Sequence, residues 1–352
     1  MSASGATAPE PPASALHTSG PPTKGEPAHG IPGLTHASRG TAYGLAAYGL
    51  WGLFPLYLQT LRPSGAVEVL AHRVLWSLLI CLGVLAVMGR LRWIGSLLQR
   101  PRMLAAVSVA GVLIATNWTV YTFAVLSEHV TEAALGYFLN PLVTVGLGVV
   151  LLRERLRRLQ WLAVGIGAVA ALYITLDYGR PPWISLALAC SFATYGLVKK
   201  RVGTSLSAIQ SLTAETLVIA PVALSVVIWL AVTGQQTFGA EGTGHTLALA
   251  GAGLATAVPL LLFAAAARRV PLSTIGLLQF LTPVLQLLTA VLLLGESMPA
   301  SRWAGFVLVW VALVLLTADS LVHGRRTRRA ARAARDRQSS LAAPTVTATT
   351  AT

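Results

Sequence analysis

Long apolar stretches with almost no charged residues recur from Thr41 to Leu321, and they limit the fold of this chain more than any other feature. Each is close to the roughly 20 residues with which a helix crosses a bilayer. Barrel strands would be about half as long and would alternate apolar with polar residues. The sequence therefore predicts an all-α membrane protein with ten transmembrane helices, near residues 41–61, 68–89, 102–126, 131–152, 157–177, 182–199, 212–233, 246–267, 272–294 and 301–321.

Composition agrees with a membrane protein and argues against several other classes. Only 11% of the residues are charged, whereas soluble domains carry about 25%. The net charge of +14 comes from short Lys and Arg clusters between apolar stretches rather than from one basic face, so no nucleic-acid partner is predicted. Cys81 and Cys190 lie far apart in apolar stretches. We therefore expect no disulfide framework, no metal site and no cofactor.

The loops alternate between basic and nearly uncharged, which indicates the orientation of the chain. Basic loops follow the second, fourth, sixth and eighth spans, as with Arg153 and Arg157 after the fourth, while the loops between them hold at most one Arg. Under the positive-inside rule, both termini are cytoplasmic in a multi-pass protein of a bacterial inner membrane. Residues 1–39 and the basic residues 323–352 lack apolar periodicity and are predicted to be disordered cytoplasmic tails.

The two halves of the chain resemble each other when the sequence is shifted by about 142 residues. The shift aligns Gly111 with Gly253, Pro141 with Pro283, Glu154 with Glu296, Trp161 with Trp303 and Asp177 with Asp319. Five helices per unit put the two copies in opposite orientations, an arrangement used by many secondary transporters. We predict two inverted five-helix repeats over residues 40–178 and 179–322.

Several segments resemble a known family, the RarD-type permeases of the EamA branch of the drug/metabolite transporters. They include Tyr48-Gly-Leu-Trp-Gly-Leu-Phe-Pro-Leu-Tyr57, Glu68-Val-Leu-Ala-His-Arg-Val-Leu-Trp-Ser77, Leu135-Gly-Tyr-Phe-Leu-Asn-Pro141 and Leu278-Gln-Phe-Leu-Thr-Pro283. The resemblance covers roughly residues 40 to 320. It implies a permease with the EamA fold and leaves the substrate open.

Three functions are compatible with such a fold. The first is a secondary transporter, a permease or exporter that moves a small metabolite or drug by alternating access. The second is a membrane receptor or assembly partner without transport. The third, an intramembrane enzyme, is disfavoured because HExxH, GxSxG and paired intramembrane aspartates are absent from the sequence. The expected partners are a small-molecule substrate and the lipid bilayer, with a homodimer left open.

The second span carries the densest group of polar residues. Glu68, His72 and Trp76 are spaced by four and share one helix face, and Arg73 lies beside them. One interpretation puts Glu68 and His72 in contact near the external interface and lets Arg73 snorkel outward. The other places His72 and Arg73 at a central cavity, where Arg binds a carboxylate or phosphate and His changes protonation. A zinc pair is a third, weaker reading, since the spans hold no further His, and Cys81 and Cys190 are not within one helical turn of the pair.

The third and fourth spans add polar residues that lipid does not satisfy. Asn117 and Tyr121 share a face of the third span, and the fourth carries Tyr137, Asn140 and Pro141. Asn117 and Tyr121 act either as interhelical hydrogen-bond partners or as substrate contacts. Pro141 marks either a packing kink or a helix break at the binding region.

The second half supplies a parallel set. Gln279 and Pro283 lie in the ninth span, and Gln286 is predicted to extend the face of Gln279 toward the membrane centre. The helix break predicted at Pro283 is the counterpart of Pro141. Glu215 in the seventh span is a weak candidate for proton coupling, together with Glu68 and His72, unless it simply reaches water or Lys199.

Overall fold

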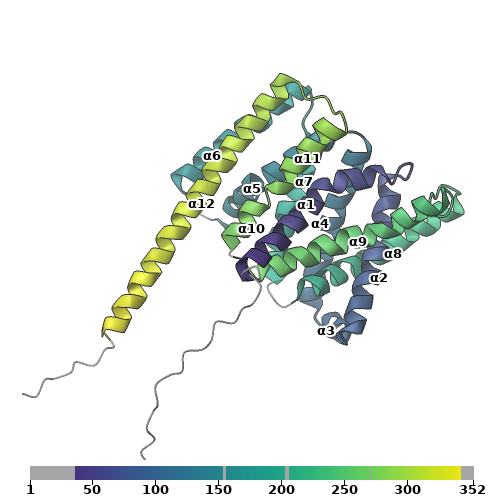
Figure 1. The fold of residues 1–352 in the computed structure, drawn as a ribbon, viewed down its shortest axis with the longest axis horizontal. Coiled ribbons are helices and arrows are strands. Elements are labelled where there is room, and N and C mark those ends of the chain that lie inside the picture. The colour runs from purple at the N-terminus through teal and green to yellow at the C-terminus, as the bar shows by residue number, and fades with distance from the viewer. Residues whose placement is uncertain (1–35, 154–155, 203–205, 271, 342–352) are drawn as a thin grey trace, which may run out of the picture. The chain divides into compact units, whose positions relative to one another are not determined.

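The computed structural model describes residues 36–153, 156–202, 206–270 and 272–341, and these residues form helices and connections without a β-strand. The first half contains α1 (His36–Gln59), α2 (Ala66–Val87), the short α3 (Trp93–Leu98), α4 (Pro101–Leu126), α5 (Val130–Leu152) and α6 (Arg158–Tyr178). The second half contains α7 (Trp183–Val202), α8 (Ala208–Val232), α9 (Gly242–Ala267), α10 (Leu272–Leu278), α11 (Leu281–Leu288), the π-helical stretch η2 (Thr289–Leu293) and α12 (Ala300–Leu341). Figure 1 shows their arrangement.

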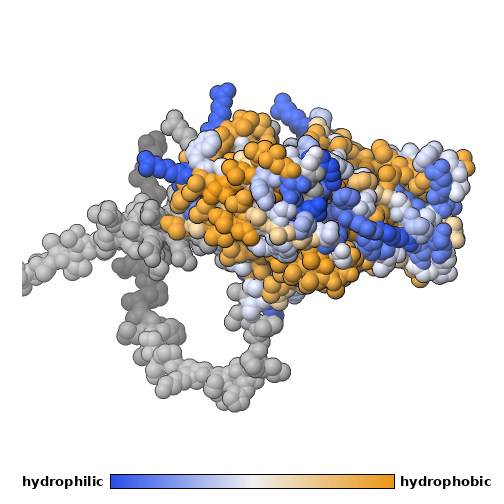
Figure 2. Space-filling view, turned by 90° about the horizontal axis from the view of Figure 1, so that it is seen from above, coloured by the Kyte–Doolittle hydropathy of each residue, from blue (hydrophilic) through white to orange (hydrophobic). Residues whose placement is uncertain are grey.

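All ten predicted spans coincide with helical segments in the described part of the chain, so the all-helical fold is confirmed. Eight described helical segments are long and apolar enough to cross a membrane, counting α10, α11 and η2 as one, and α7 adds a shorter apolar segment. The helix α3, in the basic loop after α2, was not predicted. Large hydrophobic side chains such as Leu79, Leu172 and Val314 are exposed, and hydrophobic residues cover much of the face seen in Figure 2. Lipid is the solvent that suits such a surface.

One prediction about a helix end was wrong, and one interpretation of a proline was not met. The C-terminal tail was predicted to be disordered from residue 323, but α12 continues to Leu341. This segment is rich in Ala and Arg, which are strong helix formers, and no Pro interrupts it. Of the two interpretations of Pro141, the helix break is not seen, since α5 runs through this residue. A single missing N–H removes one hydrogen bond, which a membrane helix tolerates. The predicted N-terminal tail lies outside the described residues up to Thr35, and α1 begins at His36.

The ninth span does break, next to Pro283. The helix α10 ends at Leu278, Gln279 and Phe280 form a turn, and α11 begins at Leu281. Pro283 therefore lies in the first turn of α11, where the backbone N–H groups have no helical partner in any case. Proline therefore lies inside an unbroken helix in the first half and in the first turn of a new helix in the second half.

The two halves pack together through equivalent helices. The helix α2 packs against α8, its counterpart in the second half, and α6 packs against its counterpart α12 (Figure 1). In the same way α1 contacts α9 while α7 contacts α4, and α5 contacts α11. Exchanging the halves therefore reproduces the packing, as a two-fold pseudosymmetry between inverted repeats requires.

Ion pairs between α6 and α12 follow the same symmetry. Asp319, near the end of the apolar part of α12, accepts hydrogen bonds from Arg157, which immediately precedes α6. Asp177, near the end of α6, lies 3.6 Å from Arg302 near the start of α12. The two aspartates are the pair that the 142-residue shift aligns. Each half thus contributes one carboxylate and one guanidinium to the contact.

Glu296 caps a helix of the other half. Its carboxylate accepts hydrogen bonds from the backbone N–H groups of Val130 (2.5 Å) and Thr131 (2.9 Å) at the start of α5. A carboxylate there satisfies free N–H groups and complements the positive end of the helix dipole. We expect Glu296→Gln to lower the free energy of unfolding by about 1 kcal/mol. Thermal unfolding in detergent measures it, with Glu241→Gln as a control because the exposed Glu241 side chain caps nothing. Equal losses in both variants would contradict the capping role.

Candidate functional site

Arg73 lies at the centre of the polar region, near the contacts between α2, α9, α4 and α1. Its side chain is buried, with 5% of the residue exposed. The guanidinium Nε donates a hydrogen bond of 2.7 Å to Thr256 Oγ1 on α9. The guanidinium carbon lies over the rings of Trp118 on α4, at 4.1 Å from the centroid, and Phe54 on α1, at 4.8 Å. Of the two interpretations of Arg73, the structure supports the buried one rather than snorkelling to the interface.

A glycine brings α9 close enough for this hydrogen bond. A Cβ added to Gly253 would lie 2.6 Å from the backbone carbonyl carbon of Trp76 and 2.8 Å from the backbone N of Ser77. Gly253 is three residues before Thr256, and Trp76 is three residues after Arg73, so the close contact and the hydrogen bond lie about one helical turn apart. The repeat counterpart Gly111 plays a similar part, since its added Cβ would lie 3.1 Å from the backbone O of Glu215 on α8.

Polar side chains from α4, α5 and α11 form a second layer beside Arg73. Tyr137 donates to Asn117 Oδ1 at 3.2 Å, and Asn117 donates to Ser191 Oγ and to the backbone O of Leu188 on α7. Gln286 donates to the Tyr121 hydroxyl at 3.0 Å. The rings of Tyr121 and Tyr137 are 5.7 Å apart, and Tyr121 stacks on Phe54 at 6.2 Å. The structure thus brings Asn117, Tyr121, Tyr137 and Gln286 together around the aromatic rings that contact Arg73.

Two buried polar atoms of this cluster, Arg73 Nη1 and Gln286 Oε1, have no hydrogen-bond partner, and neither has Asn140 Oδ1, three residues after Tyr137 on α5. A buried polar atom without a partner costs about 1–3 kcal/mol. Such groups persist where a ligand supplies the missing contact. The donor and the acceptors all come from residues that the sequence predicts as substrate contacts.

The connection between α8 and α9 closes one end of this region. Glu68 Oε1 accepts hydrogen bonds from the backbone N–H groups of Thr237 (2.7 Å) and Phe238 (3.3 Å). The Phe238 ring stacks on His72, with centroids 4.6 Å apart, and lies 6.3 Å from Trp76. Glu68, His72 and Trp76 share a helix face as predicted, and all three contact this loop. We call residues 235–241 the closing loop.

A hydroxyl contact ties the closing loop to the start of α2. Ser64 Oγ lies 2.6 Å from Thr237 Oγ1 and 2.9 Å from His245 Nε2, and His245 also contacts Thr237 Oγ1 at 2.9 Å. Ser64 is buried. The segment before α2, the closing loop and the first turn of α9 are therefore joined by one hydrogen-bond network.

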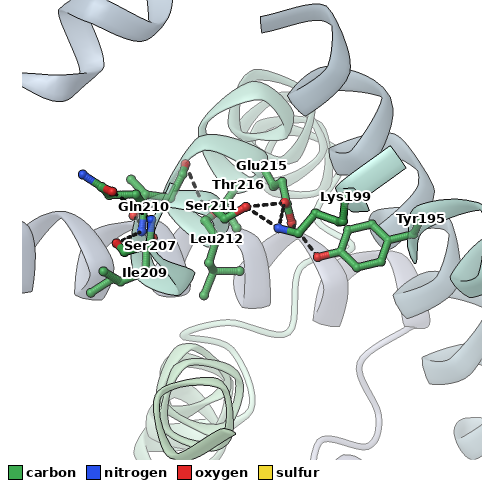
Figure 3. A network of polar contacts seen from close by, with 10 residues as sticks. Tyr195, Lys199, Ser207, Ile209, Gln210, Ser211, Leu212, Glu215 and Thr216 are labelled. Carbon is green, nitrogen blue, oxygen red and sulfur yellow. Dashed lines mark hydrogen bonds and ion pairs between the residues drawn. The ribbon is translucent and has the colours of Figure 1, made fainter. Parts of the chain in front are cut away.

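Glu215 is held by a separate network on α7 and α8 (Figure 3). Lys199 contacts Glu215 Oε1 at 2.6 Å, and Lys199 and Glu215 both bond to Ser211. The Tyr195 hydroxyl donates to Glu215 Oε2 at 3.2 Å. The alternative in which Glu215 simply reaches Lys199 thus describes this conformation. Both carboxylate oxygens have partners, which weakens the case for Glu215 as a proton carrier.

Gln279 does not belong to the site. It lies exposed in the turn between α10 and α11, whereas Gln286 is buried. The prediction that Gln279 and Gln286 form one stripe was wrong, because it assumed an unbroken helix between them.

Four residues near the site were not predicted as contacts: Phe54, Trp118, Phe238 and Thr256. Phe238 had a local signal, since it is an aromatic residue within a polar loop. Phe54 and Trp118 resemble the lipid-facing aromatics common in such helices, and Thr256 is an ordinary helix threonine. Only tertiary packing brings these three onto the Arg73 guanidinium.

A surface groove of about 440 Å³ lies elsewhere, lined by Phe123, His129, Arg180, Pro181, Trp183 and Ile184. Arg180 is engaged there by Glu132 at 2.7 Å. None of the predicted substrate contacts lines this groove, so its size does not make it the better candidate. The buried cluster around Arg73 has the chemistry that a ligand would complete.

Comparison with known proteins gives consistent matches over the helical part of the chain. The EamA-like transporter family matches residues 38–176 and again residues 182–318. Protein RarD of Streptomyces exfoliatus is 53% identical over 312 residues, covering 89% of this chain and 96% of that protein. Protein RarD of Escherichia coli K12 is 38% identical, covering 82% and 97%.

Two further matches complete the comparison. The uncharacterized transporter YojE of Bacillus subtilis is 40% identical, covering 81% of this chain and 96% of that protein. A solved crystal structure superposes with a TM-score of 0.53 at 17% identity, covering 79% of this chain and 97% of that one. At that identity the superposition demonstrates a shared fold alone.

Proposed function

Because this chain belongs to the EamA-like transporter family as a RarD-type permease, we propose that it is a secondary transporter that moves a small metabolite or drug by alternating access. Membrane transport follows from the family. The coupling to a gradient or to exchange is our proposal, since the sequence carries no GxxxxGK[ST] motif for nucleotide hydrolysis.

The observation that carries the proposal is the buried polar cluster at the contact between the two repeats. Arg73 and Asn117 from the first half lie in the interior with Thr256 and Gln286 from the second half, and Arg73 Nη1 and Gln286 Oε1 lack partners. Secondary transporters with inverted repeats bind their substrates at such an interface, near the midplane.

The distribution of basic residues among the loops supports one orientation of the protein in the membrane. The alternation of basic and nearly uncharged loops supports a bacterial inner-membrane protein with both termini in the cytoplasm. The closing loop then faces the exterior, as do the starts of α2 and α9. In this conformation the substrate path is closed at the external end by the contacts of Glu68, Ser64 and Phe238. Alternating access requires that these contacts break once in each cycle.

A reversible cross-link between Ser64 and Thr237 tests that requirement. Their hydroxyl oxygens are 2.6 Å apart, a spacing compatible with a disulfide after substitution of both by Cys. In a background without Cys81 and Cys190, we expect oxidised Ser64→Cys/Thr237→Cys to lose its flux almost completely and a reductant to restore it. Flux of a mixed metabolite pool through proteoliposomes of known orientation is the measurement.

The single variant Ser64→Cys, treated with the same oxidant, is the matched control and should keep its flux. Gel mobility under non-reducing conditions reports whether the cross-link has formed. Undiminished flux through the cross-linked protein would reject opening at this end. Absence of flux before oxidation would favour the receptor role instead.

A further inference from the structure

Arg73 is a buried cation that has no carboxylate partner among the described residues. The buried acidic side chains there are Glu68, Glu132, Glu215 and Asp319. Each is engaged elsewhere: Glu68 by the closing loop, Glu132 by Arg180, Glu215 by Lys199 and Asp319 by Arg157. No ion pair between described residues includes Arg73. A buried charge without a counter-ion is costly, and the cost falls when an anion binds.

The internal repeat provides a comparison for this missing partner. The 142-residue shift places Arg73 on α2 against Glu215 on α8. At the second position the charge is neutralised by Lys199 and both carboxylate oxygens are bonded. The repeat can therefore supply a counter-ion to a charged residue at this position, as it does for Glu215 on α8. At Arg73 it supplies Thr256 and two aromatic rings, and it leaves Nη1 without a partner.

The contacts of the guanidinium define where a ligand would bind. Thr256 uses Nε, and Trp118 and Phe54 present their rings to the guanidinium carbon. The Nη edge is left, which is the edge that donates two parallel hydrogen bonds to a carboxylate or phosphate. Further aromatic rings adjoin these two, since Phe54 contacts Tyr57 at 5.6 Å and Tyr121 at 6.2 Å.

From this arrangement we infer that the transported substrate is a small organic anion, with one carboxylate or phosphate group bound by Arg73 and an apolar or aromatic body packed against Trp118, Phe54 and Tyr121. The inference rests on the proposed transport function, because it assigns the substrate class of the same site. The anion supplies the charge that the folded chain lacks there. Neutral and cationic molecules with the same body gain nothing from the guanidinium.

The test compares three compounds that share one body: 3-phenylpropionate, 3-phenylpropanol and 3-phenylpropylamine. The anionic, neutral and cationic fractions of a metabolite extract are tested beside them. Thermal unfolding of the full-length wild-type protein in detergent measures binding. We expect the anionic compound or the anionic fraction to raise the unfolding midpoint by several degrees, and the other two classes to leave it unchanged. Stabilisation by the neutral or cationic class, or by none, overturns the inference.

Two variants and a flux assay separate this inference from the transport proposal. Arg73→Lys keeps the charge but loses the two-pronged donor, so its apparent affinity for the anion should fall about tenfold. Arg62→Lys, at an exposed arginine that pairs with Glu128 at 3.4 Å, should bind as the wild type does. Equal binding by Arg73→Lys and wild type counts against the inference. Anion binding without flux would contradict the transport proposal but not the anion assignment. Flux of neutral or cationic compounds would contradict the anion assignment but not the transport proposal.

Discussion

Replacing Arg73 with methionine is expected to abolish selective flux while leaving the folded protein as stable as the wild type or more stable. Methionine occupies a similar volume along the aromatic rings of Trp118 and Phe54. It removes a buried charge that has no counter-ion, which we expect to raise the free energy of unfolding by zero to about 3 kcal/mol. Thr256 keeps its hydrogen bond of 2.9 Å to the backbone O of Ala252. Flux should fall by about 100-fold or more, the equivalent of losing a desolvated charge-assisted contact.

The control for this prediction is Arg157→Met, at a site where the arginine is paired. That change leaves the Asp319 carboxylate, whose side chain is 10% exposed, without its cation. We expect a loss of about 1–2 kcal/mol, moderated because the Arg157 side chain is 38% exposed. Thermal unfolding of both variants and flux in proteoliposomes are the measurements. If Arg73→Met were the less stable of the two, Arg73 would be a structural residue and not a substrate contact.

Replacing Gly253 with alanine is expected to cost about 3 kcal/mol or more of stability, the largest effect that we predict for a single methyl group. The added Cβ would lie within 2.8 Å of backbone atoms of both Trp76 and Ser77. Backbone does not rotate away as a flexible side chain does, so α9 and α2 must separate, and overpacking of this kind typically costs about 1–3 kcal/mol or more. Because Thr256 is one turn away, the Arg73 hydrogen bond should be lost as well.

Two further glycines calibrate that result. A Cβ on Gly111 would lie 3.1 Å from the Glu215 backbone O, so Gly111→Ala should be intermediate. A Cβ on Gly83 in α2 meets no atom within 4 Å, and Gly83→Ala should be neutral or stabilise the helix by up to about 1 kcal/mol. Unfolding midpoints of the three variants should follow this order. A Gly253→Ala protein as stable as Gly83→Ala would mean that α2 and α9 are less tightly packed than described.

Much of the site was predictable because polar residues are conspicuous in apolar helices. His72, Arg73, Asn117, Tyr121, Tyr137 and Gln286 stand out in the sequence for that reason, and they lie together or adjacent in the structure. Gln279 stands out equally and lies elsewhere. Gln279 shows that residue spacing predicts a shared helix face only along an unbroken helix.

The partners of these residues were less predictable. Glu68 and His72 have the spacing for a contact with each other, yet the closing loop binds both. That contact joins residues about 170 positions apart. Spacing along one helix does not predict this contact, because many loops could donate backbone N–H groups to the same carboxylate.

The sequence alone determined that this is an all-helical membrane protein, where its spans lie, and that its halves are related. These properties depend on hydropathy over about 20 residues and on periodic matches, which are local or additive along the chain. Tertiary structure alone decided that Gly253 lets α9 approach α2, that Thr256, Trp118 and Phe54 surround Arg73, and that Lys199 neutralises Glu215 but nothing in the described chain neutralises Arg73. The reason is physical: whether a buried charge has a counter-ion depends on which distant helices are adjacent, and packing between helices determines that adjacency.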